Sequence, residues 1–284
     1  MADETALALL AEGRRRYEAG DYADAEPLAR RALELLSSDA TGDRLARSGA
    51  VQLAGECAYS LGRYREAGDL ADEALALRAG ASDADVAESM NLRGIVDLSL
   101  GDHERGHERV ASALRLREAA LGADAQDTLE SLNNTGVALG RLGRMDEAIA
   151  VHEEALRRCE RAYPEPTREL AVTCNALAVK LDGDDATRDR ATELYGRALE
   201  AAEAALGPEH PMVATLTSNI GTGRLNAGDL EAARPLLERA LVLHERRHGP
   251  RHPSTATVLI SCAALELRQG RATESRALAD RALA

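Results

Sequence analysis

Apolar residues recur along this chain every three or four positions, which is the spacing of a helix with one buried face. Between residues 64 and 78 the apolar residues include Ala67, Leu70, Ala74 and Leu77, and the charged residues Asp69, Asp72 and Glu73 lie between them. Glycine-containing turns separate one such stretch from the next. The pattern predicts short amphipathic helices joined by tight turns.

A unit of about 42 residues repeats seven times. Its most regular marker is an Ala-Leu pair in the second helix of each unit, and the steps between successive pairs are 42, 39, 42, 43, 42 and 42 residues. The alanines of these pairs are Ala32, Ala74, Ala113, Ala155, Ala198, Ala240 and Ala282. A small residue of the first helix keeps the same period: Gly13, Gly55, Gly94, Gly136, Ala178, Gly221 and Ala263. Self-similarity at this period predicts a solenoid of stacked helix pairs.

The repeat frame gives one solenoid domain over residues 1–284. Its seven units are expected near 5–40, 43–80, 83–121, 125–163, 167–206, 211–248 and 253–284. The first unit should contain helices near 5–18 and 22–37, followed by a polar connector from Ser37 to Gly42. The fifth unit should have a loosened turn at Gly183, and units six and seven should each begin with a proline at the first helical position.

The repeated frame resembles the tetratricopeptide repeat (TPR), because it has a small residue, a turn glycine seven positions later, an Ala or Gly, and then the Ala-Leu pair. The 42-residue step, and the connectors Leu206–Pro211 and His248–Pro253, resemble the kinesin-light-chain subtype. The chain departs from the family in having no Trp and no Phe. The resemblance implies a right-handed α-solenoid, with a concave groove of first helices that holds an extended peptide.

Composition narrows the choice of partner. The net charge of −13 disfavours nucleic acid, and a basic or neutral protein or peptide fits it better. No apolar run is long enough to span a membrane, and the acidic residues after Met1 are unlike a signal peptide. The four separated cysteines fit a reduced cytoplasmic protein, and the bias toward Ala and Arg is typical of a bacterial, GC-rich genome.

The chain contains one sequence with a catalytic spacing. His103-Glu104-Arg105-Gly106-His107 matches the H-E-x-x-H zinc motif, but the repeat frame places it across a turn and the start of a second helix, without an obvious third ligand. His210 and His252, at equivalent connectors, are interpreted as local caps or packing groups. We expect His152, His244 and His248 at solvated helix positions. With no nucleophile elbow and no phosphate-binding loop, the sequence indicates neither an enzyme nor a cofactor.

The strongest functional pattern lies three residues before the small residue of each first helix. The five central units have an amide or hydroxyl there: Gln52, Asn91, Asn133, Asn175 and Ser218. Stacked repeats would align these side chains as a ladder, and a carboxamide can both donate to and accept from a peptide backbone. The ladder therefore predicts a peptide-binding groove. The alternative, that these side chains bond the neighbouring repeat, stays open.

Other groove-facing positions are Glu88, Glu130, Arg141 and Asn226, which we expect to select a partner. Asn134 and Asn219 are expected to make contacts between repeats. The sequence thus predicts a non-catalytic scaffold. A different class of function is a ligand-sensing regulatory module cut from a larger signalling NTPase or protease. The last helix keeps Leu278 and Leu283 without a capping helix, which would allow a homodimer through the final repeat.

Overall fold

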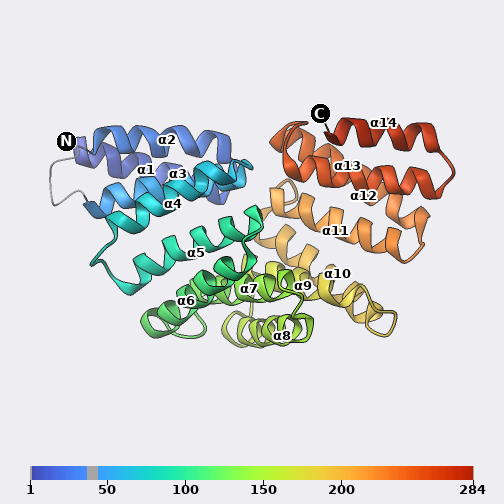
Figure 1. The fold of residues 1–284 in the computed structure, drawn as a ribbon, viewed down its shortest axis with the longest axis horizontal. Helices are drawn as coiled ribbons and strands as arrows, with labels where there is room; N and C mark the ends of the chain where they lie inside the picture. Colours follow the sequence, from blue (N-terminus) through green and yellow to red (C-terminus); the bar gives the residue numbers. More distant parts are fainter. Residues whose placement is uncertain (1, 37–43, 284) are drawn as a thin grey trace. The chain divides into compact units, whose positions relative to one another are not determined.

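The computed structural model describes residues 2–36 and 44–283, and in this part of the chain it contains fourteen α-helices and no strand (Figure 1). The helices form seven consecutive pairs. Their bounds are α1 Ala2–Glu18, α2 Tyr22–Leu35, α3 Arg44–Ser60, α4 Tyr64–Leu77, α5 Asp83–Leu100, α6 His103–Leu121, α7 Gln126–Arg141, α8 Met145–Ala162, α9 Arg168–Leu181, α10 Arg188–Leu206, α11 Pro211–Asn226, α12 Leu230–His248, α13 Pro253–Arg268 and α14 Ala272–Leu283.

The chain divides into two compact units. Unit 1 is Met1–Ala162 and contains α1 to α8, and unit 2 is Tyr163–Ala284 and contains α9 to α14. Within each unit, the two helices of a pair pack together, and the second helix also packs on the first helix of the next pair. Successive first helices touch as well, so they form one layer and the second helices form another. A single solenoid over the whole chain stays a prediction.

Each helix pair lies close to one of the seven residue ranges expected for the repeats. The loosened turn of the fifth unit is present, since six residues separate α9 from α10, and the Thr187 hydroxyl bonds the carbonyl of Leu181 at 2.5 Å. Pro211 and Pro253 begin α11 and α13 as expected. The predicted connector Ser37–Gly42 lies outside the described residues, and α2 ends at Leu35.

The core consists of small side chains on the second helices and aliphatic side chains on the first helices. The alanines of the first six Ala-Leu pairs are fully buried. The small residue of the first helix permits this close packing. A Cβ at Gly55 would lie 3.0 Å from Leu92 of the next first helix and 3.3 Å from the Cβ of Leu70 on α4. The period of the sequence therefore reflects the positions at which three helices meet.

None of the helices in the described ranges combines the length and apolarity needed to cross a membrane.

Candidate functional site

The predicted ladder of polar side chains lies mostly inside the packed layers. Gln52, Asn91, Asn133 and Ser218 are at most 7% exposed, and Asn175 is half-buried. A buried amide must find hydrogen-bond partners within the protein. These partners decide whether the ladder faces a ligand or the next repeat.

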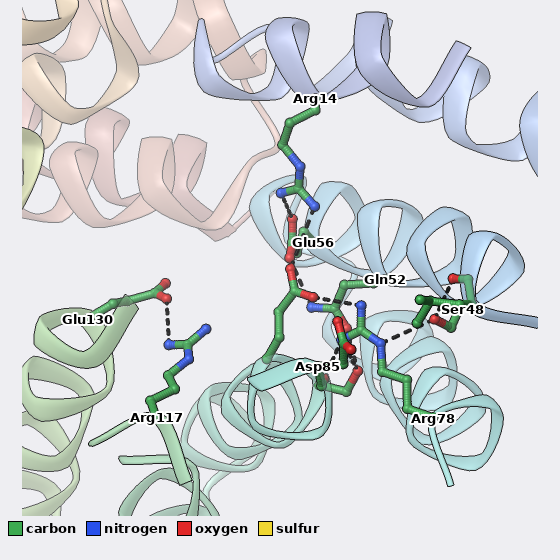
Figure 2. A network of polar contacts seen from close by, with 11 residues as sticks. Arg14, Ser48, Gln52, Glu56, Arg78, Asp85, Arg117 and Glu130 are labelled. Carbon is green, nitrogen blue, oxygen red and sulfur yellow. Dashed lines mark hydrogen bonds and ion pairs between the residues drawn. The ribbon is translucent and has the colours of Figure 1, made fainter. Parts of the chain in front are cut away.

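In unit 1, an arginine after the second helix joins two successive first helices (Figure 2). Arg78, which follows α4, is 4% exposed. Its guanidinium donates to the Asp85 carbonyl at 2.6 Å, to the Ser89 hydroxyl at 2.8 Å and to the Ser48 hydroxyl at 3.2 Å, and it pairs with Glu88 at 2.6 Å. Ser48 lies on α3 and the other partners lie on α5. The arginine therefore fixes the spacing of α3 and α5.

The same arrangement recurs one repeat later. Arg117 of α6 is 3% exposed and donates to the Asp127 carbonyl at 2.7 Å and to the Ser131 hydroxyl at 2.8 Å. It also donates to Glu130 at 3.0 Å, which is the contact that Figure 2 draws. All three partners lie on α7. We call these two clusters the arginine junctions. They consist of Arg78 with Ser48, Asp85, Glu88 and Ser89, and of Arg117 with Asp127, Glu130 and Ser131.

Two ladder amides of unit 1, Gln52 and Asn91, are bonded to the serines of these junctions. Ser89 donates to the Gln52 carbonyl oxygen at 2.8 Å, and Ser131 donates to Asn91 Oδ1 at 3.3 Å. Asn134 Nδ2 also donates to Asn91 Oδ1 at 3.1 Å. Both bonds on Asn91 cross from α7 to α5, as expected for Asn134. The amides thus connect one first helix to the next.

Asn133 has a different partner, the buried ring of His152 on α8. The His152 Nδ1 lies 3.2 Å from Asn133 Oδ1, and the ring fills the space above Gly136. In unit 2, Asn219 of α11 donates to Asn175 of α9 at 2.9 Å, so the expected contact between repeats is present. These bonds favour the packing interpretation of the ladder. Direct contact between its amides and a peptide stays a prediction.

The accessible polar groups of unit 1 lie beside the ladder on the first helices. Arg14 of α1 pairs with Glu56 of α3 and lies 3.7 Å from Glu88 of α5 (Figure 2). The side chains of Arg14, Glu88 and Glu130 are 37%, 32% and 37% exposed. Burial raises the pKa of Glu56, and the Glu88 carboxylate adds to the rise, while Arg14 opposes it. Three carboxylates and one guanidinium therefore follow one another across the first-helix face.

Two tyrosines extend this face. The Tyr17 hydroxyl lies 3.4 Å from the Ser60 hydroxyl, and Tyr59 lies 3.2 Å from Ser99, so each tyrosine reaches the next first helix. We define the unit 1 face as Arg14, Tyr17, Glu56, Tyr59, Glu88 and Glu130. The predicted selectivity residue Arg141 is exposed at the end of α7, and Asn226 is exposed at the end of α11.

The histidines differ from the sequence-based expectation. His210 and His252 are N-caps of α11 and α13, so their interpretation as caps is confirmed. His152 and His244 were expected at solvated positions, and this was wrong, because they are 0% and 2% exposed. Both occupy second-helix positions that pack against first helices, and the repeat period alone does not distinguish a ring that fills this space from an exposed one.

The H-E-x-x-H motif lies at the start of α6, with His103 as its first residue and Asp102 as its N-cap. Among the described residues, no three His, Cys, Asp or Glu side chains are grouped so that they could hold a metal ion. The motif therefore has no third protein ligand within that part of the chain.

Comparison with sequence families identifies the repeats. One tetratricopeptide repeat family model matches residues 85–161, 188–241 and 213–284, and a second matches residues 10–84. The chain therefore belongs to the tetratricopeptide repeat family. Among curated protein sequences, none matches it.

Solved structures with a similar fold include three repeat proteins. The Rap conjugation gene regulator of plasmid pLS20, in complex with the Phr* peptide, has a TM-score of 0.76 and 15% identity over 97% of this chain and 72% of its own. BtubC from P. vanneervenii has a TM-score of 0.58 and 21% identity over 78% of this chain and 87% of its own. A Podosopora anserina kinesin light chain with nearly identical TPR-like repeats has a TM-score of 0.53 and 14% identity over 72% of this chain and 97% of its own. The all-α, TPR-type fold and the kinesin-light-chain likeness are confirmed.

Proposed function

We propose that this protein is a non-catalytic scaffold that binds an extended segment of a basic or neutral partner protein on the unit 1 face. The observation that carries the proposal is the row formed by Arg14, Glu56, Glu88 and Glu130. It crosses four first helices while its outer members remain partly exposed. Membership of the TPR family supports a binding scaffold. The Rap regulator, whose fold is similar, was solved with a peptide.

The buried junctions explain how such a face could be ready for a ligand. Arg78 holds Glu88, and Arg117 holds Glu130, so both carboxylates have a fixed position before any partner arrives. A preformed surface loses less conformational entropy on binding than a flexible one. In this proposal the amides Gln52 and Asn91 set the spacing between helices, and the carboxylates contact the partner. An extended segment with Arg or Lys side chains fits the acidic row best.

The test is selection of displayed random peptides on the full chain, followed by affinity measurement of the selected peptides. The Glu88→Gln/Glu130→Gln variant keeps hydrogen-bond acceptors and removes both charges, and we expect it to bind about 10-fold more weakly, or about 1.4 kcal/mol. The matched control is Glu104→Gln/Glu108→Gln, which removes two exposed charges from the second helix α6. Equal binding by both variants, or failure to select any peptide, would refute the proposal.

A further inference from the structure

The unit 1 face contains a site that surrounds a guanidinium group, and in this structure the group belongs to the chain itself. Arg14 of α1 donates from Nη1 to Glu56 Oε2 of α3 at 2.5 Å (Figure 2), and its Nη2 lies 3.7 Å from Glu88 Oε1 of α5. Its Cζ lies over the Tyr17 ring, 5.7 Å from the centroid. Carboxylates and an aromatic face are groups that suit the planar guanidinium. We call Tyr17, Glu56 and Glu88 the guanidinium site.

The two carboxylates are held in place by groups other than Arg14. Glu56 Oε1 accepts from Gln52 Nε2 at 2.9 Å, and Glu88 Oε2 pairs with the Arg78 guanidinium at 2.6 Å. Both supporting side chains are buried, at 1% and 4% exposed. Each glutamate therefore uses one oxygen to bond the interior of the protein and turns the other toward Arg14. Removal of Arg14 would leave the site formed, with one oxygen of each carboxylate open to another donor.

Arg14 is the exchangeable member of this cluster. Its side chain is 37% exposed, against 14% for Glu56, and its long stem can rotate into water. Glu56, by contrast, needs a cation beside it. Burial raises the pKa of its carboxyl and the Glu88 carboxylate adds to the rise, while Arg14 opposes it. A partly buried pair of carboxylates is more stable with a guanidinium between them, and an external guanidinium can supply that charge when Arg14 moves away.

We propose that the guanidinium site is an arginine-binding subsite of the unit 1 face, which Arg14 fills in the free protein and a partner's arginine fills after displacing it. This proposal rests on the proposed function and names the side chain that the acidic row selects. A guanidinium is planar and presents several donors to Glu56 and Glu88 while it lies over Tyr17, whereas the lysine ammonium is a compact point charge. Arg14 thereby lowers the apparent affinity for the partner, since only the fraction of molecules with an open site can bind.

A small cation tests the site without a peptide. Arg14→Ala empties the guanidinium site in the full chain, and ethylguanidinium has the same head group as the missing side chain. Because a ligand that binds only the folded protein raises its unfolding temperature, we expect about 50 mM ethylguanidinium to raise the midpoint of Arg14→Ala by roughly 2 °C relative to its effect on the wild type. Ethylammonium at the same concentration should give no such difference. Equal shifts of variant and wild type, or equal effects of the two cations, would overturn the proposal.

Two further variants assign the effect to the named residues. Arg16→Ala removes a charge from the same helix at a side chain that pairs with Glu12 and is 48% exposed, and it should respond to ethylguanidinium as the wild type does. Arg14→Ala/Glu56→Gln also lacks one carboxylate of the site, and we expect it to lose the difference. Should Arg14→Ala lose its helical circular dichroism, Arg14→Gln replaces it in both variants. A difference that persists in the folded double variant would refute the guanidinium site.

Peptides test displacement by a partner. Peptides selected on the wild-type chain are measured against Arg14→Ala and Arg16→Ala, each peptide with its arginines and with lysines in their place. Because Arg14→Ala removes the competing group, we expect it to bind the arginine form roughly 5-fold more tightly than Arg16→Ala, which has the same net charge. The lysine form should gain less.

The outcomes separate this proposal from the proposed function. Equal binding of the arginine form by Arg14→Ala and Arg16→Ala would refute displacement of Arg14 and leave the proposed function standing. A selection that yields no peptide would refute the proposed function, and with it the role of Arg14 as a competitor, whatever ethylguanidinium does.

Discussion

Units 1 and 2 have chemically different side chains at the same position of the repeat. Four residues after the alanine of the Ala-Leu pair, unit 1 has Arg78 and Arg117, and unit 2 has His244 at the end of its middle pair. All three side chains are nearly fully buried, and each bonds at least one first helix. The backbone frame is therefore the same, while the chemistry that holds the next repeat differs.

The difference lies in the partners that the next first helix offers. Five residues before the small residue, α5 and α7 present Ser89 and Ser131, whereas α13 presents Val258. Directly before these serines, α5 and α7 have Glu88 and Glu130, and the equivalent residue of α13 is Thr257. An arginine keeps its charge at any physiological pH and needs several acceptors. A neutral imidazole can lie against aliphatic side chains, at the cost of sensitivity to acid.

The largest change in the free energy of unfolding is expected when His244 of unit 2 is replaced by arginine, the residue that unit 1 has at the equivalent position. His244→Arg would bury a guanidinium where the native ring has the Ala214 carbonyl as an acceptor, in place of the several acceptors around Arg78, and we expect unit 2 to lose about 4 kcal/mol of unfolding free energy. Urea denaturation read by hydrogen exchange of α13 measures the loss. The control is Val242→Arg, at a position of α12 that is 54% exposed, which should change the free energy by no more than about 0.5 kcal/mol. A well-tolerated His244→Arg would show that the surroundings of His244 supply further acceptors beside the Ala214 carbonyl.

Disrupting an arginine junction should lower the free energy of unfolding by somewhat less than His244→Arg does. Arg78→Met keeps the apolar stem but removes the guanidinium that donates to the Asp85 carbonyl and pairs with Glu88 at 2.6 Å, and we expect a loss of about 3 kcal/mol from unit 1. The same measurement on Arg65→Met, an exposed arginine of α4, is the matched control and should show little change. Equal values for the two variants would mean that the junction contributes nothing beyond helix packing.

Substitutions at two glycines, one in each unit, test the effect of packing on stability without a change of charge. A Cβ at Gly136 would lie 2.6 Å from the His152 ring, so Gly136→Ala should destabilise unit 1 by about 2 kcal/mol. A Cβ at Gly196, in α10 of unit 2, would meet nothing within 4 Å. Gly196→Ala should therefore stabilise its helix by about 0.8 kcal/mol. Thermal unfolding would give shifts of opposite sign, and shifts of the same sign would contradict this account of the small-residue position.

The smallest effect is expected at the amide bond of unit 2. Asn219→Ala removes the donor to Asn175 and should cost about 1 kcal/mol. Asn226→Ala, at the exposed end of the same helix, is expected to stay within about 0.5 kcal/mol. If Asn219→Ala were neutral in chemical denaturation, the bond between α9 and α11 would not stabilise unit 2.

Only part of the candidate site could be predicted from the sequence. The ladder of Gln52, Asn91 and Asn133 was visible as a repeated polar position, but not the burial of these amides or their partners. The arginine junctions were missed altogether. Their signal was present as an arginine four residues after the alanine of the Ala-Leu pair, together with a Glu-Ser pair near the start of the next first helix. It could not be interpreted without knowing that both positions meet between the same helices.

What the sequence determined by itself was the repeat: seven helix pairs, their turns and the small residues at which helices approach. Those features follow from local spacing and from the steric limits of glycine and proline, so they can be counted along the chain. Only the tertiary structure decided which polar groups are buried together. The junction of Arg78 and the buried position of His244 join residues from different helices, and the pKa of His244 depends on how far water is kept from its ring. These depend on packing in three dimensions, which a one-dimensional period does not specify.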